Sequence, residues 1–322
     1  MGMTMHTVAP ARKDFLSVLD FEPSELERCL EIAAHVKADR PLGRQAPTSG
    51  ALEGRHVAML FEKASLRTRS TFEIATVELG GNVVSLQPES ALGNREPVAD
   101  VARNLERWVD GVVIRTFSQR VLEEFAAAAP RLHVINALTD DQHPCQALAD
   151  AMPLREQWGS VRGRTLTYVG DGNNVAVSLV HVAVMLGMHV HVASPDGYQL
   201  PAGTVQQAAA AARHGARLRL FTDADDAVAG ADAVYTDTWT SMGQEAEADT
   251  RRRVFAPYQV NESLMSQAKP GALFMHCLPA HRGEEVTADI FESAASVVFD
   301  QAENRLHAQK ALLSMLLSGP RV

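Results

Sequence analysis

Short apolar runs rich in β-branched residues alternate with amphipathic stretches along nearly the whole chain, and this alternation constrains the fold more than any other feature. The apolar runs lie at 56–62, 82–87, 111–116 and 133–138 in the first half, and at 165–170, 189–194, 217–221, 233–237 and 272–277 in the second. Strands that alternate with helical segments are typical of βαβ units, whose sheets are parallel. We therefore predict an α/β protein with doubly wound parallel sheets.

The length of the chain indicates more than one domain. At roughly 150 residues per domain, its 322 residues predict two domains. A helical run ends in a polar, glycine-bounded turn at 158–163, just before a new strand, so we place the boundary close to this turn. The last segment, 302–317, has the apolar spacing of one amphipathic helix, and this helix can pack against either domain.

Composition excludes several functional classes. Lys and Arg number 30 against 39 Asp and Glu, which gives a net charge of −9 and an isoelectric point of about 5.7, so we expect no binding to nucleic acid or to an anionic membrane. Three scattered cysteines form no Cys-x-x-Cys pair, which favours a reducing compartment. The sequence has no apolar signal segment and no run of about 18 apolar residues, so we predict a cytoplasmic protein.

The first candidate site is Ser65-Leu-Arg67-Thr68-Arg69, where a predicted strand gives way to a helix. A helix N-terminus offers unpaired backbone N–H groups, and the hydroxyl and guanidinium groups add donors that suit phosphate oxygens. The segment is not a Walker A loop, because it lacks the required glycines and lysine. The alternative interpretation is a capped helix that carries two solvated arginines.

Two further motifs follow predicted strands. His143 and Gln146 lie three residues apart at a helix start that Pro144 initiates, so both can donate to one carbonyl oxygen, although a histidine before proline is often only a turn residue. The glycine-rich turn at 170–174 resembles a dinucleotide-binding turn but has valine where the last glycine of that fingerprint belongs. A nicotinamide enzyme, with Asp196 as the ribose acid, stays open as an alternative.

The last two motifs lie at 235–243 and 275–283, again just past predicted strands. Asp237 can accept a hydrogen bond from a substrate ammonium, and Ser241 can hold polar groups. Cys277 is either a polarizable site thiol or an inert core residue. Because His276 and Cys277 have no second metal-spaced pair, they are weak indicators of zinc.

The shared location of these residues favours a functional interpretation. In open α/β sheets, ligands bind at the carboxyl ends of the strands. The candidates from both halves of the chain follow strand ends: 65–69, Arg115, His143, Asn174, Asp237 and Cys277. We expect two such edges, one per domain, to face each other across an active-site cleft, where an anionic and a cationic substrate meet.

These motifs resemble those of the aspartate/ornithine carbamoyltransferase family, and of its ornithine branch in particular, over about residues 14–317. Ser65-Leu-Arg67-Thr68-Arg69 resembles the family's Ser-Thr-Arg-Thr-Arg motif, and His143-Pro-Cys-Gln146 resembles its His-Pro-x-Gln motif. His276-Cys277-Leu278-Pro279 resembles the His-Cys-Leu-Pro motif of the ornithine branch. The segments 170–174, 237–243 and 303–305 are similar to its ornithine-binding motifs and its final active-site arginine.

The resemblance implies the reaction of carbamoyl phosphate with L-ornithine to give citrulline and phosphate, without a metal or organic cofactor. It implies a carbamoyl-phosphate domain of residues 1–155, to which a C-terminal helix at about 303–322 returns, and an ornithine domain of residues 156–302. It assigns carbamoyl-phosphate binding to Ser65, Leu66, Arg67, Thr68, Arg115, His143, Gln146, Cys277, Leu278 and Arg305. It assigns ornithine binding to Asn174, Asp237, Ser241 and Met242, and catalysis to Arg115, His143, Cys277 and Asp237. Assembly as a homotrimer, or a multiple of trimers, is also implied.

The sequence departs from the family pattern at two positions. Leu66 replaces the usual threonine, where a backbone N–H still suits phosphate, and Ala91 stands where many members have a glutamine that reaches a neighbouring subunit. A carbamoyltransferase of another amine, such as N-acetylornithine or putrescine, and a catalytically silent binding protein remain alternatives. The sequence does not distinguish a role in arginine biosynthesis or the urea cycle from one in arginine breakdown.

Overall fold

The computed structural model describes residues 13–92, 95–241 and 243–318, and its contacts divide the chain into two compact units. The first unit comprises Met1–Ala149 and Asn304–Val322, and the second comprises Asp150–Glu303. Two helices, α6 (Pro144–Trp158) and α13 (Val298–Leu317), each contribute residues to both units.

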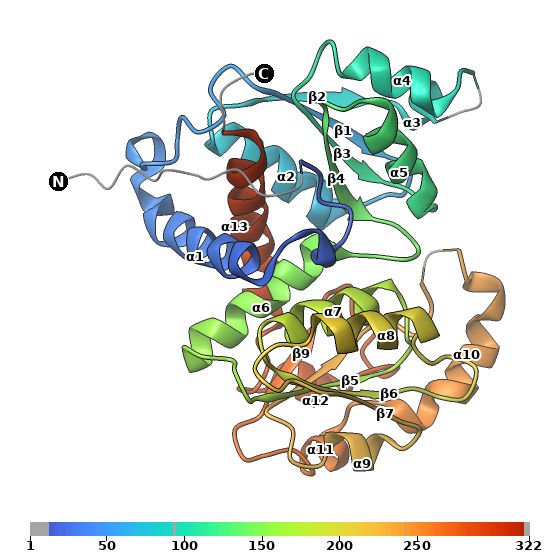
Figure 1. The fold of residues 1–322 in the computed structure, drawn as a ribbon. Helices are drawn as coiled ribbons and strands as arrows, with labels where there is room; N and C mark the ends of the chain where they lie inside the picture. The colour runs from blue at the N-terminus through green and yellow to red at the C-terminus, as the bar shows by residue number, and fades with distance from the viewer. Residues whose placement is uncertain (1–12, 93–94, 242, 319–322) are drawn as a thin grey trace. The chain divides into compact units, whose positions relative to one another are not determined.

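The first unit is built on a four-stranded parallel sheet in the order β2-β1-β3-β4 (Figure 1). The strands are β1 (His56–Phe61), β2 (Asn82–Leu86), β3 (Gly111–Arg115) and β4 (His133–Leu138). The helices are α1 (Pro23–Asp39), α2 (Leu66–Glu78), α3 (Pro88–Ala91), α4 (Val98–Leu105) and α5 (Gln119–Ala128), with 3-10 turns at Val18–Asp20 and Arg40–Gln45.

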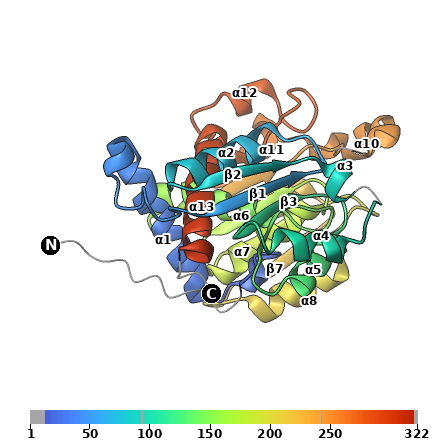
Figure 2. The same ribbon diagram turned by 90° about the horizontal axis from the view of Figure 1, so that it is seen from above.

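Helices cover both faces of this sheet. The apolar side chains of one face of β1 and β3, including Leu60 and Ile114, pack with α4 and α5 in a single buried cluster. On the other face α2 lies beside α13 (Figure 2), and Glu78 of α2 pairs with Lys310 of α13 at 3.0 Å. All five residues of β3 are buried, as expected for a central strand of a parallel sheet.

The second unit has a five-stranded parallel sheet in the order β7-β6-β5-β8-β9. The strands are β5 (Thr165–Val169), β6 (His189–Ala193), β7 (Leu218–Phe221), β8 (Ala233–Thr236) and β9 (Leu273–His276). The helices are α7 (Asn174–Met185), α8 (Ala202–Ala211), α9 (Ala224–Val228), α10 (Ala248–Phe255), α11 (Glu262–Met265) and α12 (Ala288–Phe291), with 3-10 turns at Glu245–Glu247 and Ala256–Tyr258.

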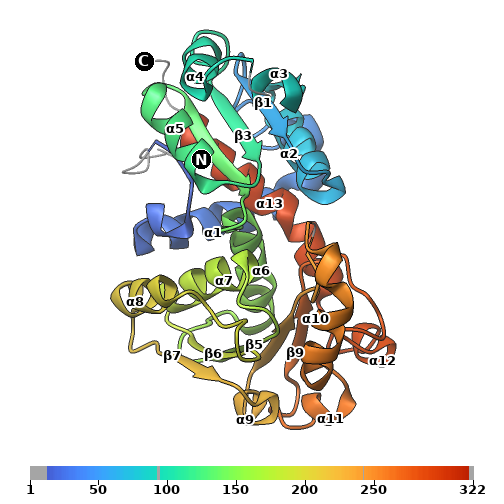
Figure 3. The ribbon, with the colours of Figure 1, turned by 90° about the vertical axis from the view of Figure 1, so that its right-hand side faces the viewer.

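Layers on both sides of this second sheet are visible in Figure 3, with α7 and α8 on one face and α9 and α11 on the other. Apolar residues of α9, α11 and α12 form one buried cluster with side chains of β5, β8 and β9, such as Val169, Val234 and Phe274. None of the helices in the described part of the chain is both long and apolar enough to cross a membrane.

The predicted α/β fold with two parallel sheets is confirmed, and all nine predicted strands occur. Most strands end one residue before the predicted end, so that Asp237 and Cys277 lie in the loops after β8 and β9. Helix α8 ends at Ala211, because the backbone is extended at Ala212 and left-handed at His214 and Gly215. Helix α13 begins four residues before its predicted start.

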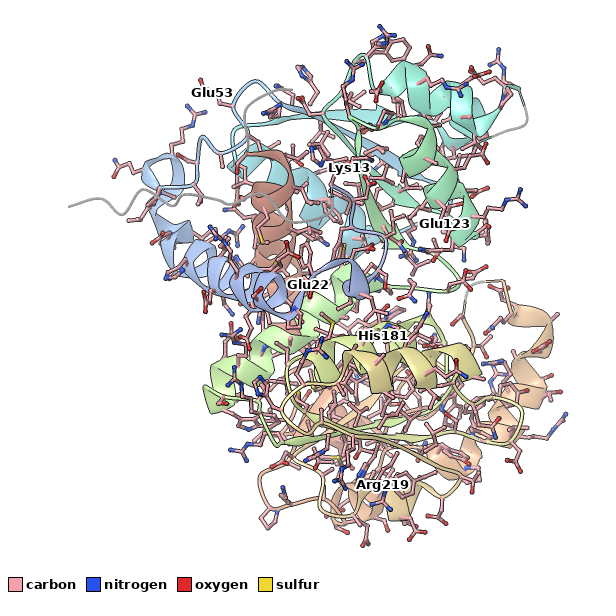
Figure 4. All side chains as sticks on the ribbon, viewed as in Figure 1. Lys13, Glu22, Glu53, Glu123, His181 and Arg219 are labelled. Atoms are coloured by element: carbon pink, nitrogen blue, oxygen red, sulfur yellow. The ribbon has the colours of Figure 1, made fainter. Side chains whose placement is uncertain are left out.

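Helix α7 is buried from Val175 to Met185, and it carries His181 (Figure 4). The His181 side chain is fully buried, and neither ring nitrogen has a hydrogen-bond partner among the described residues. Burial lowers the pKa of His181 to about 4, so the ring is neutral at pH 7.

This buried histidine predicts a loss of stability in acid. Between pH 6.5 and 4 the unfolded chain gains a proton at His181 that the folded chain does not, so stability present above pH 6.5 is lost as the pH falls. For a shift from 6.5 to about 4, the loss at pH 4 is about 3 kcal/mol. We expect His181→Gln to remove this part of the pH dependence, measured as the free energy of unfolding at pH 7 and pH 4. An identical pH dependence in both proteins would contradict the assignment.

Candidate functional site

In the first unit, the loop after β1 leads into the N-terminus of α2. Ser65 is the N-cap, and its hydroxyl oxygen accepts a hydrogen bond from the backbone N–H of Thr68 at 3.2 Å. An anion can therefore bind here, where the backbone N–H groups of the first turn and the positive end of the helix dipole attract it. The side chain of Leu66 is 78% exposed, so this residue can serve an anion only through its backbone.

A buried arginine joins three distant parts of the first unit. The guanidinium of Arg305, on α13, donates hydrogen bonds to the hydroxyl of Thr68 on α2 and to the amide oxygen of Gln146 on α6. Arg305 is only 3% exposed. Thr68, Gln146 and Arg305, all candidates from the sequence, are thus in direct contact.

The side chain of His143 is also buried in this cluster. Burial lowers its pKa well below the usual value, and the nearby positive charges of Arg305, Arg115 and Arg67 lower it further. His143 is therefore neutral at pH 7 and can donate one N–H without adding charge. Arg115, the last residue of β3, is 7% exposed. We call Ser65, Leu66, Arg67, Thr68, Arg115, His143, Gln146 and Arg305 the first-unit cluster.

Sequence reasoning missed Lys63, which lies beside the first-unit cluster. This residue is 7% exposed, forms an ion pair with Asp140, and lies 4.1 Å above the ring of Phe117. The pair ties the loop after β1 to the loop that leads to His143. A single buried lysine two residues before an N-cap does not change the hydrophobic periodicity of the sequence. Only its position next to the motif at 65–69 could have indicated a role.

In the second unit, the side chains of Cys277 and Asn173 both contact Asp237, which lies just after β8. One carboxylate oxygen accepts a hydrogen bond from the thiol of Cys277 at 3.0 Å, and the other accepts one from the side-chain amide of Asn173 at 3.0 Å. Asp237 is 6% exposed and Cys277 is 8% exposed. The loops after β5, β8 and β9 therefore meet at one carboxylate.

Cys277 is a thiol and not a thiolate at neutral pH. Burial raises its pKa well above the usual value, and the negative charge of Asp237 raises it further. The thiol is then a donor to Asp237, and it is a poor base in this arrangement.

The loop after β9 is held by the ring of His276, which is completely buried. The backbone N–H of Leu278 donates to its Nδ1 at 2.9 Å, so Nε2 carries the proton and faces Glu285 at 3.2 Å. Leu278 has φ of +62°, a left-handed conformation that costs a branched side chain free energy. The ring contacts hold the backbone in this unusual shape.

Asn173 is a second residue to which sequence reasoning gave no role in the site. It caps α7 by accepting hydrogen bonds from the backbone N–H groups of Val175 and Ala176, besides donating to Asp237. The predicted residue Asn174 is the first residue of α7 and is half-buried. Ser241 is also half-buried, in the loop after β8, and Met242 lies outside the described residues. We call Asn173, Asn174, Asp237, Ser241, Cys277 and Leu278 the second-unit cluster.

Neither a dinucleotide nor a metal fits the second-unit cluster well. A Cβ atom on Gly172 would collide with the backbone of Gln199 and Leu200. Glycine is therefore required here because another part of the chain lies against it, and this contact leaves no space for a pyrophosphate at that position. The ligand atoms of Asp237, His276 and Cys277 lie within 4.8 Å of one another. Both ring nitrogens of His276 are already engaged, however, and the thiol of Cys277 donates to Asp237.

Ala91, at the position of the family's inter-subunit glutamine, is 8% exposed and belongs to the apolar cluster between the first sheet and α4 and α5. It offers no polar group to a ligand.

Comparisons with known proteins identify the family of the chain. Residues 13–156 match the aspartate/ornithine carbamoyltransferase carbamoyl-P binding domain, and residues 162–316 match the Asp/Orn binding domain of the same family. The chain belongs to the aspartate/ornithine carbamoyltransferase family.

Within this family, the relatives are named ornithine carbamoyltransferase. The protein of Anoxybacillus flavithermus is 48% identical over 98% of this chain and 100% of its own length, and that of Thermococcus kodakarensis is 47% identical over 98% and 99%. Among solved structures, the ornithine carbamoyltransferase from Pyrococcus furiosus is 46% identical with a TM-score of 0.92, covering 97% of this chain and 99% of its own. The enzyme from Thermus thermophilus is 43% identical with a TM-score of 0.85, covering 95% and 99%.

Proposed function

We propose that this protein is an ornithine carbamoyltransferase, which transfers the carbamoyl group of carbamoyl phosphate to the δ-amine of L-ornithine. The new bond joins the amine nitrogen to the carbamoyl carbon, the bond from that carbon to the phosphate oxygen breaks, and citrulline and phosphate are the products. The observation that carries this proposal is the match of nearly the whole chain to ornithine carbamoyltransferases, together with an arginine-rich cluster in one unit and a carboxylate-centred cluster in the other.

The first-unit cluster is assigned to carbamoyl phosphate. Ser65, Leu66, Arg67 and Thr68 bind the phosphate at the N-terminus of α2, where backbone N–H groups and guanidinium donors suit its charge. Arg115, His143 and Gln146 donate to the carbamoyl oxygen as it gains negative charge in the tetrahedral intermediate. Arg305 holds Thr68 and Gln146 in place, which the buried hydrogen bonds support.

The second-unit cluster is assigned to ornithine. Asp237 and Ser241 accept hydrogen bonds from the α-ammonium, and Asn174 and Met242 bind the α-carboxylate region. The backbone carbonyls of Cys277 and Leu278 orient the carbamoyl group. The carboxylate of Asp237 has the charge to complement an ammonium, and its hydrogen bonds with Asn173 and Cys277 leave further lone pairs for a substrate donor.

The δ-amine must be neutral to attack, although an alkyl ammonium has a pKa of about 10.4 in water. Because Cys277 is protonated and donates to Asp237, we assign it to orienting that carboxylate. The proton of the attacking amine then leaves with the departing phosphate.

We also propose a homotrimer, or a multiple of trimers, in the cytoplasm. Apolar side chains of α2 are unusually exposed, with Leu66 at 78%, Ile74 at 41% and Val77 at 63%, which supports a contact between copies of the chain. The three free, buried cysteines fit a reducing compartment. Light scattering at three times the chain mass of 34.9 kDa, or a multiple of it, is the expected result, and a monomer would contradict the assembly.

The experiment that tests the reaction is product analysis with purified protein. We expect citrulline and phosphate in equal amounts from carbamoyl phosphate and L-ornithine, and no carbamoyl aspartate when L-aspartate replaces ornithine. No binding of NAD is expected in the same preparation. Carbamoyl aspartate as the main product would place the chain in the other branch of the family.

A further inference from the structure

Arg251, on α10, is buried among the loops that carry the second-unit cluster. It is 3% exposed. Its Nη2 donates to the carboxylate of Asp171 in the turn after β5, and its Nε donates to the backbone carbonyl of Trp239 in the loop after β8. The guanidinium also lies 4.8 Å from the ring of Tyr198 and 5.2 Å from that of Phe255.

The contacts of Arg251 satisfy groups that would otherwise be costly to bury. Burial raises the pKa of Asp171, and the positive charge and hydrogen bond of Arg251 counteract this rise. The aromatic faces of Tyr198 and Phe255 stabilise the cation, and the rigid planar guanidinium makes both hydrogen bonds at once. A lysine would keep the positive charge, but its single ammonium group could not make the two hydrogen bonds in the planar geometry of the guanidinium.

The two segments that Arg251 joins each hold part of the second-unit cluster. The turn of Asp171 continues directly into Asn173, which caps α7 and donates to Asp237. The loop of Trp239 runs from Asp237 to Ser241, and Trp239 itself is 4% exposed and stacks on Phe255. The spacing between Asn173 and the Asp237 loop therefore depends on a residue that belongs to neither segment.

We propose that Arg251 is a positioning residue for the amino-acid substrate, setting the distance between the turn after β5 and the loop after β8. The proposal rests on the proposed function, because it takes ornithine as the ligand of those two segments. Arg251 acts through Asp171 and Trp239. A displacement of about 1 Å in a binding group is enough to cost a large factor in turnover or affinity.

Steady-state kinetics of Arg251 variants test this role. We expect Arg251→Gln to raise KM for ornithine at least about tenfold, while KM for carbamoyl phosphate changes less than about twofold. Arg251→Lys should raise KM for ornithine less than Arg251→Gln does, because lysine keeps the positive charge but not the planar pair of hydrogen bonds. Asp171→Asn should raise KM for ornithine in the same way, and adding it to Arg251→Gln should cause little further change.

Arg252→Gln is the matched control. Arg252 is the next residue of α10, but its side chain is 51% exposed and pairs with Asp249 and Glu284 at the surface. We expect this variant to keep both KM values within about twofold of the original protein. If Arg251→Gln folds and leaves KM for ornithine unchanged, or raises both KM values in parallel, the positioning role is wrong.

A readout without turnover separates this proposal from the proposed function. The chain has three tryptophans, so Trp108→Phe and Trp158→Phe leave Trp239 as the only reporter. In that background Arg251→Gln should shift Trp239 emission to longer wavelength, because its loop admits water, and Arg252→Gln should not. If the emission shifts but the protein forms no citrulline, the proposed function is wrong, and Arg251 still holds the two loops together. If the emission does not shift, Arg251 does not hold the loops together, and the positioning role is wrong.

Discussion

Arg67→Ala is expected to lower kcat/KM for carbamoyl phosphate at least a hundredfold. Arg67 is the second residue of α2, beside the N-cap Ser65, and its charge contributes to keeping His143 neutral, so it lies within the first-unit cluster. The loss of a preorganised donor to developing charge costs about 2.7 to 4 kcal/mol of transition-state stabilisation, which is about 10² to 10³ in rate.

Arg69→Ala is the control for this experiment. Arg69 is the last residue of the predicted anion-binding motif, two residues further along the same helix. Its side chain, however, is 46% exposed and pairs with Glu73 four residues later, so it is not part of the first-unit cluster. An exposed pair of this kind contributes little to stability, and we expect activity within about twofold of the original protein. If the two substitutions have equal effects, or if Arg67→Ala has near-normal activity, the motif does not bind phosphate and is only a capped helix.

The fold could be predicted from local signals because each strand has one. The run Gly111–Arg115 is apolar and β-branched and is buried throughout, and polar or glycine-bounded turns separate such runs from the helices. The ends of elements were less predictable. The start of α13 precedes its apolar pattern by four residues, since Asp300 and Gln301 continue the helix without an apolar periodicity.

The candidate site was predictable where a side chain follows a strand. His143, Asp237 and Cys277 became candidates because the carboxyl ends of parallel strands share one edge of a sheet. Lys63, Asn173 and Arg251 were not given roles, because each acts by holding another side chain. Arg251 meets Asp171, 80 residues earlier in the chain, and no spacing rule in a single sequence predicts such a pair.

Selectivity for the amine substrate should produce the largest effect of all. Asp237 and Ser241 are assigned to the free α-ammonium of ornithine, and acetylation removes that charge and adds a bulky amide beside the loop of Ser241. Putrescine lacks both the α-ammonium and the α-carboxylate. A site built to bond a polar group rejects an analogue that lacks it by about 10⁴ to 10⁵, because buried partners are left unpaired. Asp237 is 6% exposed, and its two hydrogen-bond donors, the amide of Asn173 and the thiol of Cys277, are neutral. Its negative charge therefore lacks a cationic partner when the substrate has no α-ammonium.

The most direct test is kcat/KM for L-ornithine, N-acetyl-L-ornithine and putrescine, measured side by side at saturating carbamoyl phosphate. We expect ornithine to exceed both other amines by about 10⁴ or more. We also expect Asp237→Asn to weaken the use of ornithine much more than the binding of carbamoyl phosphate. If N-acetylornithine or putrescine equals or exceeds ornithine, membership of the family stands, but the ornithine assignment and the roles of Asp237 and Ser241 are wrong.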